Sequence, residues 1–212
     1  MKINNTTIHE VEQGTPEWMD LRIGKITASK VKAILNIDGK LKAKGPLQTA
    51  LSKVLAEIET GFSNDSDFMS DAMEWGVEHE FEVIDKYKTD MFAPIGFATN
   101  SKFKYLGCSP DMVFYGENAK FEKGIEIKCP NSATHIKWHL DNKIPNEHLH
   151  QVLIYFLIFE LEKMSFVSYD PRNNKRPYFE KTILKKDIQP LLDQTEESIL
   201  RFEFLINEHL KK

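Results

Sequence analysis

Three features are scarce in this sequence of 212 residues: cysteine, apolar runs of membrane length and an excess of positive charge. The only two cysteines, Cys108 and Cys129, allow at most one disulfide, and we expect both to be reduced, buried packing residues. The longest apolar run, from Val152 to Phe159, is far too short to span a bilayer. The first residues lack the apolar core of a signal peptide, so we expect a cytoplasmic protein with no membrane association.

The charge balance is slightly acidic, with a formal net charge of −4. A basic excess is the usual footprint of nucleic-acid binding, so charge alone leans slightly against DNA as a partner. Two considerations weaken this objection, because a metal-dependent nuclease concentrates carboxylates and a local basic channel can exist in an acidic protein. Hydrophobic residues make up 41% and charged residues 28% of the chain, as in ordinary globular proteins. The length fits one compact domain over residues 1–212.

The order of hydrophobic patterns predicts an α/β (α+β) fold with a central mixed β-sheet flanked by helices. Strands are expected at 97–98, 103–106, 112–115, 124–129, 164–169 and 178–183. Helices are expected at 15–22, 27–35, 46–60, 70–88, 134–139, 146–160 and 186–211, with Thr15, Thr27 and Ser70 as N-caps. Residues 36–45 read as a lysine-rich loop.

The segment from Gly124 to Pro130 carries the clearest chemical signal. Strand side chains alternate between faces, so Glu126 and Lys128 share one face while the two isoleucines at 125 and 127 share the other. Pro130 cannot continue a central ladder, and the strand should end there. A carboxylate and an ammonium group are therefore placed side by side near a strand terminus.

Asp111 opens an apolar strand directly after Pro110. If this strand pairs with residues 124–129, Asp111 approaches Glu126, and two carboxylates beside Lys128 form a site for a hard cation such as Mg²⁺. Such a metal activates water and neutralises a scissile phosphate, while Lys128 can orient or deprotonate the water or stabilise the transition state. A Glu-x-Lys pattern also occurs on solvated strands, and that reading stays open.

Glu80 lies on the apolar stripe of its expected helix, between Val77 and Ile84. A carboxylate there is costly unless it is paired or metal-bound, so we expect Glu80 to be a third acid of the site, with a buried ion pair as the alternative. Glu78 and Glu82 lie off the stripe and are expected to be solvated.

Gln151 begins a helix that is apolar nearly all round and should be buried. A buried amide needs partners, which a catalytic centre or a backbone carbonyl would supply. The flanking His148 and His150 lack a convincing zinc spacing. Near the N-terminus, Arg22 offers a planar fork for a phosphate, and Thr27 and Ser29 would lie at a helix N-terminus that favours anions, or would form a simple cap beside a surface arginine.

Six ordered motifs together resemble the lambda-type (phage alkaline) exonuclease family of the PD-(D/E)XK nuclease superfamily, over residues 11–172. In chain order they are Val11-Glu12-Gln13-Gly14 with Trp18, Leu21-Arg22, Gly24 and Ile26-Thr27-Ala28-Ser29; Trp75-Gly76 with Glu80; Cys108-Ser109-Pro110-Asp111; Glu126-Ile127-Lys128-Cys129-Pro130; Gln151-Val152; and Tyr169-Asp170-Pro171-Arg172. Met112 and Leu153 depart from this pattern, since the family usually has glycine at the first position and the lambda enzyme has glutamine at the second.

The resemblance implies a restriction-endonuclease-like core and a magnesium-dependent 5′-to-3′ exonuclease acting on double-stranded DNA ends. Such enzymes prefer a 5′-phosphate, leave 3′ single-strand overhangs for phage-type recombination, form a ring-shaped homotrimer and work with a single-strand annealing protein. Encoded by a phage, the protein would act in the host cytoplasm.

The resemblance also assigns roles to individual positions. Asp111 and Glu126 would bind the metal together with the backbone carbonyl of Ile127, and Lys128 would be the catalytic lysine. Two Mg²⁺ ions are implied, with Mn²⁺ as a substitute.

Further positions are assigned in the same way. Glu80 and Gln151 would complete the centre through waters, and Arg22, Ser29 and Ser109 would hold the terminal 5′-phosphate. Two other functions stay open: an endonuclease of the same superfamily, which would also cut closed circular DNA, and a non-catalytic DNA-end-binding scaffold, which would not cut at all.

Overall fold

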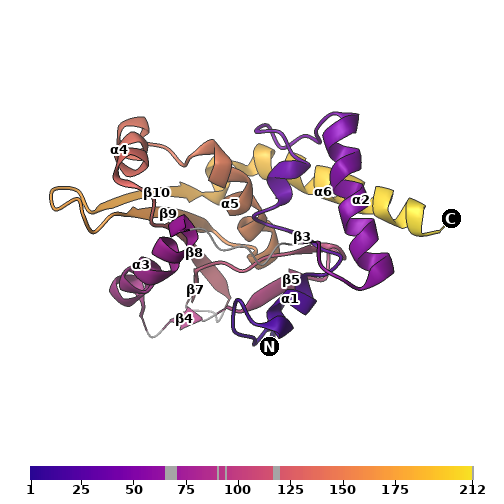
Figure 1. The fold of residues 1–212 in the computed structure, drawn as a ribbon, viewed down its shortest axis with the longest axis horizontal. Coiled ribbons are helices and arrows are strands. Elements are labelled where there is room, and N and C mark those ends of the chain that lie inside the picture. The colour runs from indigo at the N-terminus through magenta and orange to yellow at the C-terminus, as the bar shows by residue number, and fades with distance from the viewer. Residues whose placement is uncertain (65–70, 90, 94, 117–119, 212) are drawn as a thin grey trace.

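A computed structural model describes residues 1–64, 71–89, 91–93, 95–116 and 120–211, without the side chains of residues 72 and 73 (Figure 1). Its strands are β1 Lys2–Ile3, β2 Thr6–His9, β3 Ile26–Thr27, β4 Phe92–Ala93, β5 Phe97–Asn100, β6 Leu106–Gly107, β7 Met112–Tyr115, β8 Phe121–Lys128, β9 Lys163–Tyr169 and β10 Tyr178–Leu184. Its helices are α1 Pro16–Arg22, α2 Lys44–Thr60, α3 Asp71–Tyr87, α4 Ser132–Asp141, α5 Asn146–Phe159 and α6 Gln189–Leu210, with short 3₁₀ turns η1 Val31–Ala33 and η2 Lys185–Asp187.

A five-stranded mixed sheet in the order β10-β9-β8-β7-β4 organises the fold. Strands β8 and β9 are parallel, and the other pairs in this sheet are antiparallel. A parallel pair needs a crossover, and here α4 and α5 provide it and pack back against the sheet. This mixed sheet with flanking helices is the architecture expected from the sequence.

The two faces of β8 have different partners. Ile125 and Ile127 belong to a buried cluster with Val83 of α3. Glu126 between them meets Tyr155 of α5, which belongs to the larger core that also includes α6. The expected alternation of β8 is therefore confirmed, and it aims Glu126 away from the apolar cluster under α3.

Most predicted elements agree with the structure to within a few residues. Thr15 caps α1 through the backbone N–H of Trp18, with Pro16 at the first helical position. The prediction of Ser70 as an N-cap lies outside the described residues.

The predicted helix at 27–35 is wrong, and only the 3₁₀ turn η1 forms there. The reason is tertiary: Ile26 and Thr27 pair in parallel with Leu106 and Gly107, so Thr27 is a buried strand residue and no helix cap. The same pairing corrects the strand predicted at 103–106, because β6 begins only at Leu106. Strands β1 and β2 were not predicted, since they are short and β2 pairs with the distant β5.

The burial of α3 also differs from the prediction. Val77 is 64% exposed, whereas Val83 is fully buried. Glu80 is half-buried on the face toward β8, and Glu78 is exposed as expected. Glu82 is not simply solvated, because it accepts hydrogen bonds from Tyr169 Oη and interacts with His79 Nδ1. No helix in the described part of the chain is both long and apolar enough to cross a membrane.

Candidate active site

The carboxyl end of β8 lies directly beside Asp111. The antiparallel register pairs Met112 with Ile125, which brings the preceding Asp111 alongside the end of β8. The backbone N–H of Ile127 donates to Asp111 Oδ2 over 2.5 Å and fixes the position of this carboxylate. The pairing assumed from the sequence is therefore present.

Glu126 is fully buried between an ammonium group and a phenol. Its Oε1 forms an ion pair with Lys128 Nζ, without the geometry of a regular hydrogen bond. Its Oε2 accepts a hydrogen bond of 2.7 Å from Tyr155 Oη. Lys128 Nζ also donates to the carbonyl oxygen of Ile127 over 2.8 Å. The acid and the lysine thus form a tight cluster, and the solvated reading of the Glu-x-Lys pattern is wrong.

Glu80 completes this cluster from α3. Its side chain interacts with the side chain of Asp111 and with the charges of Lys128 and Glu126. Burial raises the pKa of Glu80, opposed by Lys128 and reinforced by Glu126. Burial and the charge of Glu126 likewise hold the pKa of Asp111 well above its ordinary value. Like charges brought together without a cation favour protonation, so these acids form a site suited to added positive charge.

A cavity of about 400 Å³ opens beside this cluster, lined by Glu80, Lys128, Cys129 and His148 among others. Burial and the charges of Lys128 and Lys32 lower the pKa of His148 to about 3, so its imidazole is neutral at physiological pH. Glu80 and Lys128 are therefore accessible to a ligand from this cavity.

The donor set fits a magnesium-type cation. Asp111 and Glu126 offer carboxylate oxygens, and the carbonyl oxygen of Ile127, the residue after Glu126, accepts a hydrogen bond from Lys128 Nζ beside them. Glu126 Oε1 is buried against the positively charged ammonium group of Lys128 and has no other partner among the described residues. Among the described residues, no three His, Cys, Asp or Glu side chains form a ready-made cage. Mg²⁺ keeps several waters and relies on few protein ligands, so this donor set suits it.

Tyr155 is a member of this cluster that the sequence interpretation missed. Its hydroxyl lies 2.7 Å from Glu126 Oε2, accepts from Gln151 Nε2 at 2.5 Å and lies 3.5 Å from the carbonyl oxygen of Ser109. Gln151 and Tyr155 are four residues apart on α5, and this spacing within an otherwise apolar helix was the available signal. Gln151 is half-buried and not fully buried as expected, and the partner of its amide is a phenol that in turn holds Glu126.

The predicted phosphate residues are only partly brought together. The guanidinium of Arg22 stacks on the ring of Trp18 at 3.9 Å, and Trp18 Nε1 donates to Ser109 Oγ over 2.9 Å. Ser109 Oγ itself donates to the carbonyl oxygen of Gly96 over 2.7 Å. Arg22 and Ser109 therefore belong to one structural unit, joined by an indole that the family motif contains.

Ser29 reaches this region along a different path. Thr27 pairs in parallel with Gly107. Ser29 and Ser109 each follow two residues later, on these two neighbouring chain segments. Ser29 is exposed, its hydroxyl lies 3.2 Å from Thr27 Oγ1, and it lines a second, larger cavity. The predicted helix N-terminus at this position is absent, so backbone dipoles of a helix are not part of any anion site here.

Two further motif residues, Asp170 and Arg172, lie beside the end of β8 and support the site. Arg172 donates from Nε to Asp170 Oδ1 over 2.7 Å and from Nη2 to the carbonyl oxygen of Pro130 over 3.1 Å. Its guanidinium also stacks on the ring of Trp75 at 4.2 Å. This arginine therefore ties the end of β8 to α3, and so holds Glu80 near Lys128.

The cysteines are buried free thiols, as expected from their scarcity. Burial raises the pKa of Cys129 to about 12, helped by the charge of Glu80, so this thiol stays protonated beside the acids. Burial and Glu126 raise the pKa of Cys108 as well.

Comparison with known proteins places this geometry in a family. A search of curated proteins finds no significant match. An alkaline exonuclease from Laribacter hongkongensis, LHK-Exo, is similar in structure with a TM-score of 0.72 and 27% identity, covering 93% of this chain and 96% of that one. LHK-Exo in complex with dAMP gives a TM-score of 0.73 and 28% identity over the same shares.

A more distant structure shares only the fold. A phage-related exonuclease from Haemophilus somnus 129PT gives a TM-score of 0.51 and 12% identity, over 87% of this chain and 96% of that one. At the level of sequence families, residues 17–162 match the model of the YqaJ-like viral recombinase domain. Because this match spans most of the chain and contains Glu80, Asp111, Glu126 and Lys128, the protein belongs to the YqaJ-like viral recombinase family.

Proposed function

We propose that this protein is a magnesium-dependent exonuclease that degrades duplex DNA from its ends. The observation that carries the proposal is the convergence of Glu80, Asp111, Glu126 and Lys128 at the end of β8, since residues 80 and 128 are far apart in sequence. The structurally similar LHK-Exo is an alkaline exonuclease, which supports the same activity. A scaffold that only bound DNA ends would have no use for acids that repel phosphate.

The chain's own residues account for most of the proposed chemistry. Asp111, Glu126 and the carbonyl of Ile127 would hold Mg²⁺, which when bound activates a water and neutralises charge on the phosphate. The carboxylates of Glu126 and Asp111 outweigh the opposing effect of burial and raise the pKa of Lys128. At this position Lys128 can orient or deprotonate the attacking water, or donate a hydrogen bond to the developing charge.

Glu80 and Gln151 are positioned at the edge of the same cluster. Glu80 lines the cavity beside Lys128, where its carboxyl group can bind a water. Gln151 is oriented by Tyr155, which also fixes one oxygen of Glu126. These contacts keep the reacting groups in one arrangement before substrate binds.

Arg22 and Ser109 would hold the 5′-phosphate of the terminal nucleotide, with Ser29 on the neighbouring segment. The stacking of Arg22 on Trp18 orients the guanidinium plane, and a planar fork suits a phosphate. We infer from the resemblance a 5′-to-3′ polarity, a 3′ overhang, two Mg²⁺ ions, a homotrimeric ring and a single-strand annealing partner in the cytoplasm.

Release of mononucleotides from linear duplex DNA tests the proposal. The wild-type protein should release them in Mg²⁺, release none in EDTA and leave closed circular DNA intact. Lys128→Ala should abolish release, with Lys186→Ala as a matched control on an exposed lysine of η2. Cutting of the closed circle would instead favour an endonuclease, and DNA-end binding with no release in Mg²⁺ would favour a scaffold.

A further inference from the structure

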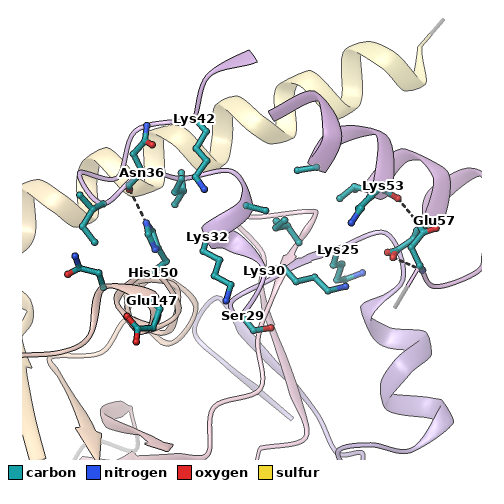
Figure 2. Close-up of a pocket in the computed structure, with 18 residues that line it drawn as sticks. Lys25, Ser29, Lys30, Lys32, Asn36, Lys42, Lys53, Glu57, Glu147 and His150 are labelled. Carbon is teal, nitrogen blue, oxygen red and sulfur yellow. Dashed lines mark hydrogen bonds between the residues drawn. The ribbon is translucent and has the colours of Figure 1, made fainter. Parts of the chain in front are cut away.

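The larger cavity of the molecule, about 780 Å³ in volume, lies between α2, η1 and the first turns of α5 (Figure 2). Its volume falls in the range of small-molecule binding pockets, roughly 300–1,000 Å³. Only Ser29 is shared with the proposed active-site residues. The cavity is therefore a separate feature, and its chemistry needs its own explanation.

Five lysines from three chain segments surround this cavity. They are Lys25, Lys30, Lys32, Lys42 and Lys53. Two acids also line it, but Glu57 is 5% exposed and both of its oxygens already accept backbone N–H groups, from Gly24 at 3.0 Å and from Asn64 at 2.9 Å. Glu147 is the second acid, so the five lysines outnumber the two acids and favour an anionic ligand.

The floor of the cavity is apolar and includes Leu35, Val54 and the partly exposed Ile37. At its edge, His150 is 8% exposed and lies 2.9 Å from the carbonyl oxygen of Asn36 through Nε2. That contact requires a proton on Nε2, so in the neutral imidazole Nδ1 is a lone-pair acceptor, and it is buried with no hydrogen-bond partner among the described residues. A buried acceptor without a partner is unfavourable, and a donor on a ligand would satisfy it.

An apolar floor, a buried acceptor and a cationic rim match the parts of a nucleotide. The base would lie on the apolar floor, where its N–H groups can reach the histidine, and the phosphates would lie among the lysines. We propose that this cavity binds an unpaired nucleotide of single-stranded DNA, as a second DNA subsite beside the catalytic cluster.

The position of the cavity favours a strand of the substrate over a free nucleotide. Asn146, Glu147 and His150 line it from the start of α5, while His148 on the same turns lines the cavity of Lys128. Neighbouring residues in the first turns of α5 thus line the two cavities, so a single DNA strand can reach both. The inference rests on the proposed function, because the bound strand would be part of the nuclease substrate.

Binding of a 3′-fluorescein-labelled single-stranded octamer, measured by anisotropy in EDTA, tests this subsite without cleavage. Lys32→Ala/Lys53→Ala should weaken binding about tenfold or more, as expected when hydrogen bonds between charged groups are lost. The slope of log affinity against log salt should fall by about 0.7 for each lost phosphate contact. Both lysines are exposed, so the fold should persist, which thermal melting checks.

The matched control removes the same charge at the other end of α5. Lys120 and Lys185 line a different cavity beside Phe159, and Lys120→Ala/Lys185→Ala should bind the octamer as the wild type does. Ile37→Ser should weaken binding about threefold without changing the salt slope, because it removes apolar contact and no charge.

Several results would overturn the inference. Equal losses in the pocket and control variants would show general charge attraction, and dAMP competing as well as the octamer would assign the cavity to a free nucleotide. Unchanged binding in Lys32→Ala/Lys53→Ala with normal nuclease activity would disprove the subsite and leave the proposed function standing. If the octamer binds through these lysines but the wild-type protein releases no nucleotides in Mg²⁺, the subsite would stand and the proposed function would be disproved.

Discussion

Two cavities flank the first turns of α5, and they have opposite chemistry. One holds Glu80 and Lys128, beside Asp111 and Glu126, and suits a cation. The other is lined by five lysines and suits an anion. The formal net charge of −4 hides this separation, because acids and bases average out over the chain. Local clusters of charged side chains, and not the net charge of the chain, therefore decide whether an acidic protein is suited to bind DNA.

The largest effect should come from the cluster of acids at the end of β8. Glu126→Gln keeps the shape of the side chain but removes the charge that faces Lys128, and it should lower nucleotide release by about 10²–10³-fold, the usual cost of losing a key electrostatic group. Single-turnover digestion of a linear duplex measures this. A variant with wild-type rates would contradict the assignment, and Glu78→Gln on the exposed face of α3 serves as its control.

The next effect concerns Tyr155, which positions Glu126 in that cluster. Tyr155→Phe removes the hydrogen bonds to Glu126 and Gln151 while keeping the ring, so it should raise the Mg²⁺ concentration needed for half-maximal activity by about 10–100-fold. A Mg²⁺ titration of activity measures the shift. A loss of activity that excess Mg²⁺ does not restore would mean that Tyr155 acts in another way.

A smaller and more selective effect is expected at the phosphate residues. Arg22→Ala should remove the preference for a 5′-phosphate over a 5′-hydroxyl end, a factor of about 10–100 if charged hydrogen bonds of 1.5–3 kcal/mol are lost. Competition between the two duplex ends measures the ratio. Equal preference in wild type and variant would contradict the assigned pocket, whereas a lower rate on both ends would indicate general damage.

The smallest effect should be on stability alone. Glu57 lines the lysine cavity but caps the backbone at Gly24 and Asn64, so Glu57→Ala should lower the free energy of unfolding by about 1–3 kcal/mol. Urea denaturation measures the change. If Glu57→Ala is as stable as wild type, the hydrogen bonds of Glu57 do not hold its carboxylate in place, and this charge is free to offset the lysines. The difference in charge between the two cavities would then be smaller.

The central part of the site could be predicted from the sequence because it depends on local rules. Strand alternation placed Glu126 and Lys128 on one face, and Pro130 marked the end of β8. The meeting of Asp111 with this strand required only an antiparallel pair with a short connection. Each of these inferences uses residues within about one hairpin of each other.

Other parts of the molecule depend on long-range contacts that periodicity cannot show. The segment at 27–35 has a helical pattern, yet its pairing with Leu106 and Gly107 turns its start into a strand. Tyr155 looked like one more apolar residue of α5, and only the fold reveals its contact with Glu126. The lysine cavity likewise combines η1, α2 and α5, which no single motif contains.

Metal binding tests the central claim most directly, because it is independent of DNA and of turnover. Free Mn²⁺ gives an electron paramagnetic resonance signal that decreases when the ion binds to protein. The wild type should bind Mn²⁺ in competition with Mg²⁺, and Asp111→Asn should lose this binding while Glu78→Gln retains it. Equal Mn²⁺ binding by wild type and Asp111→Asn, or no binding by either, would contradict a metal centre at the end of β8.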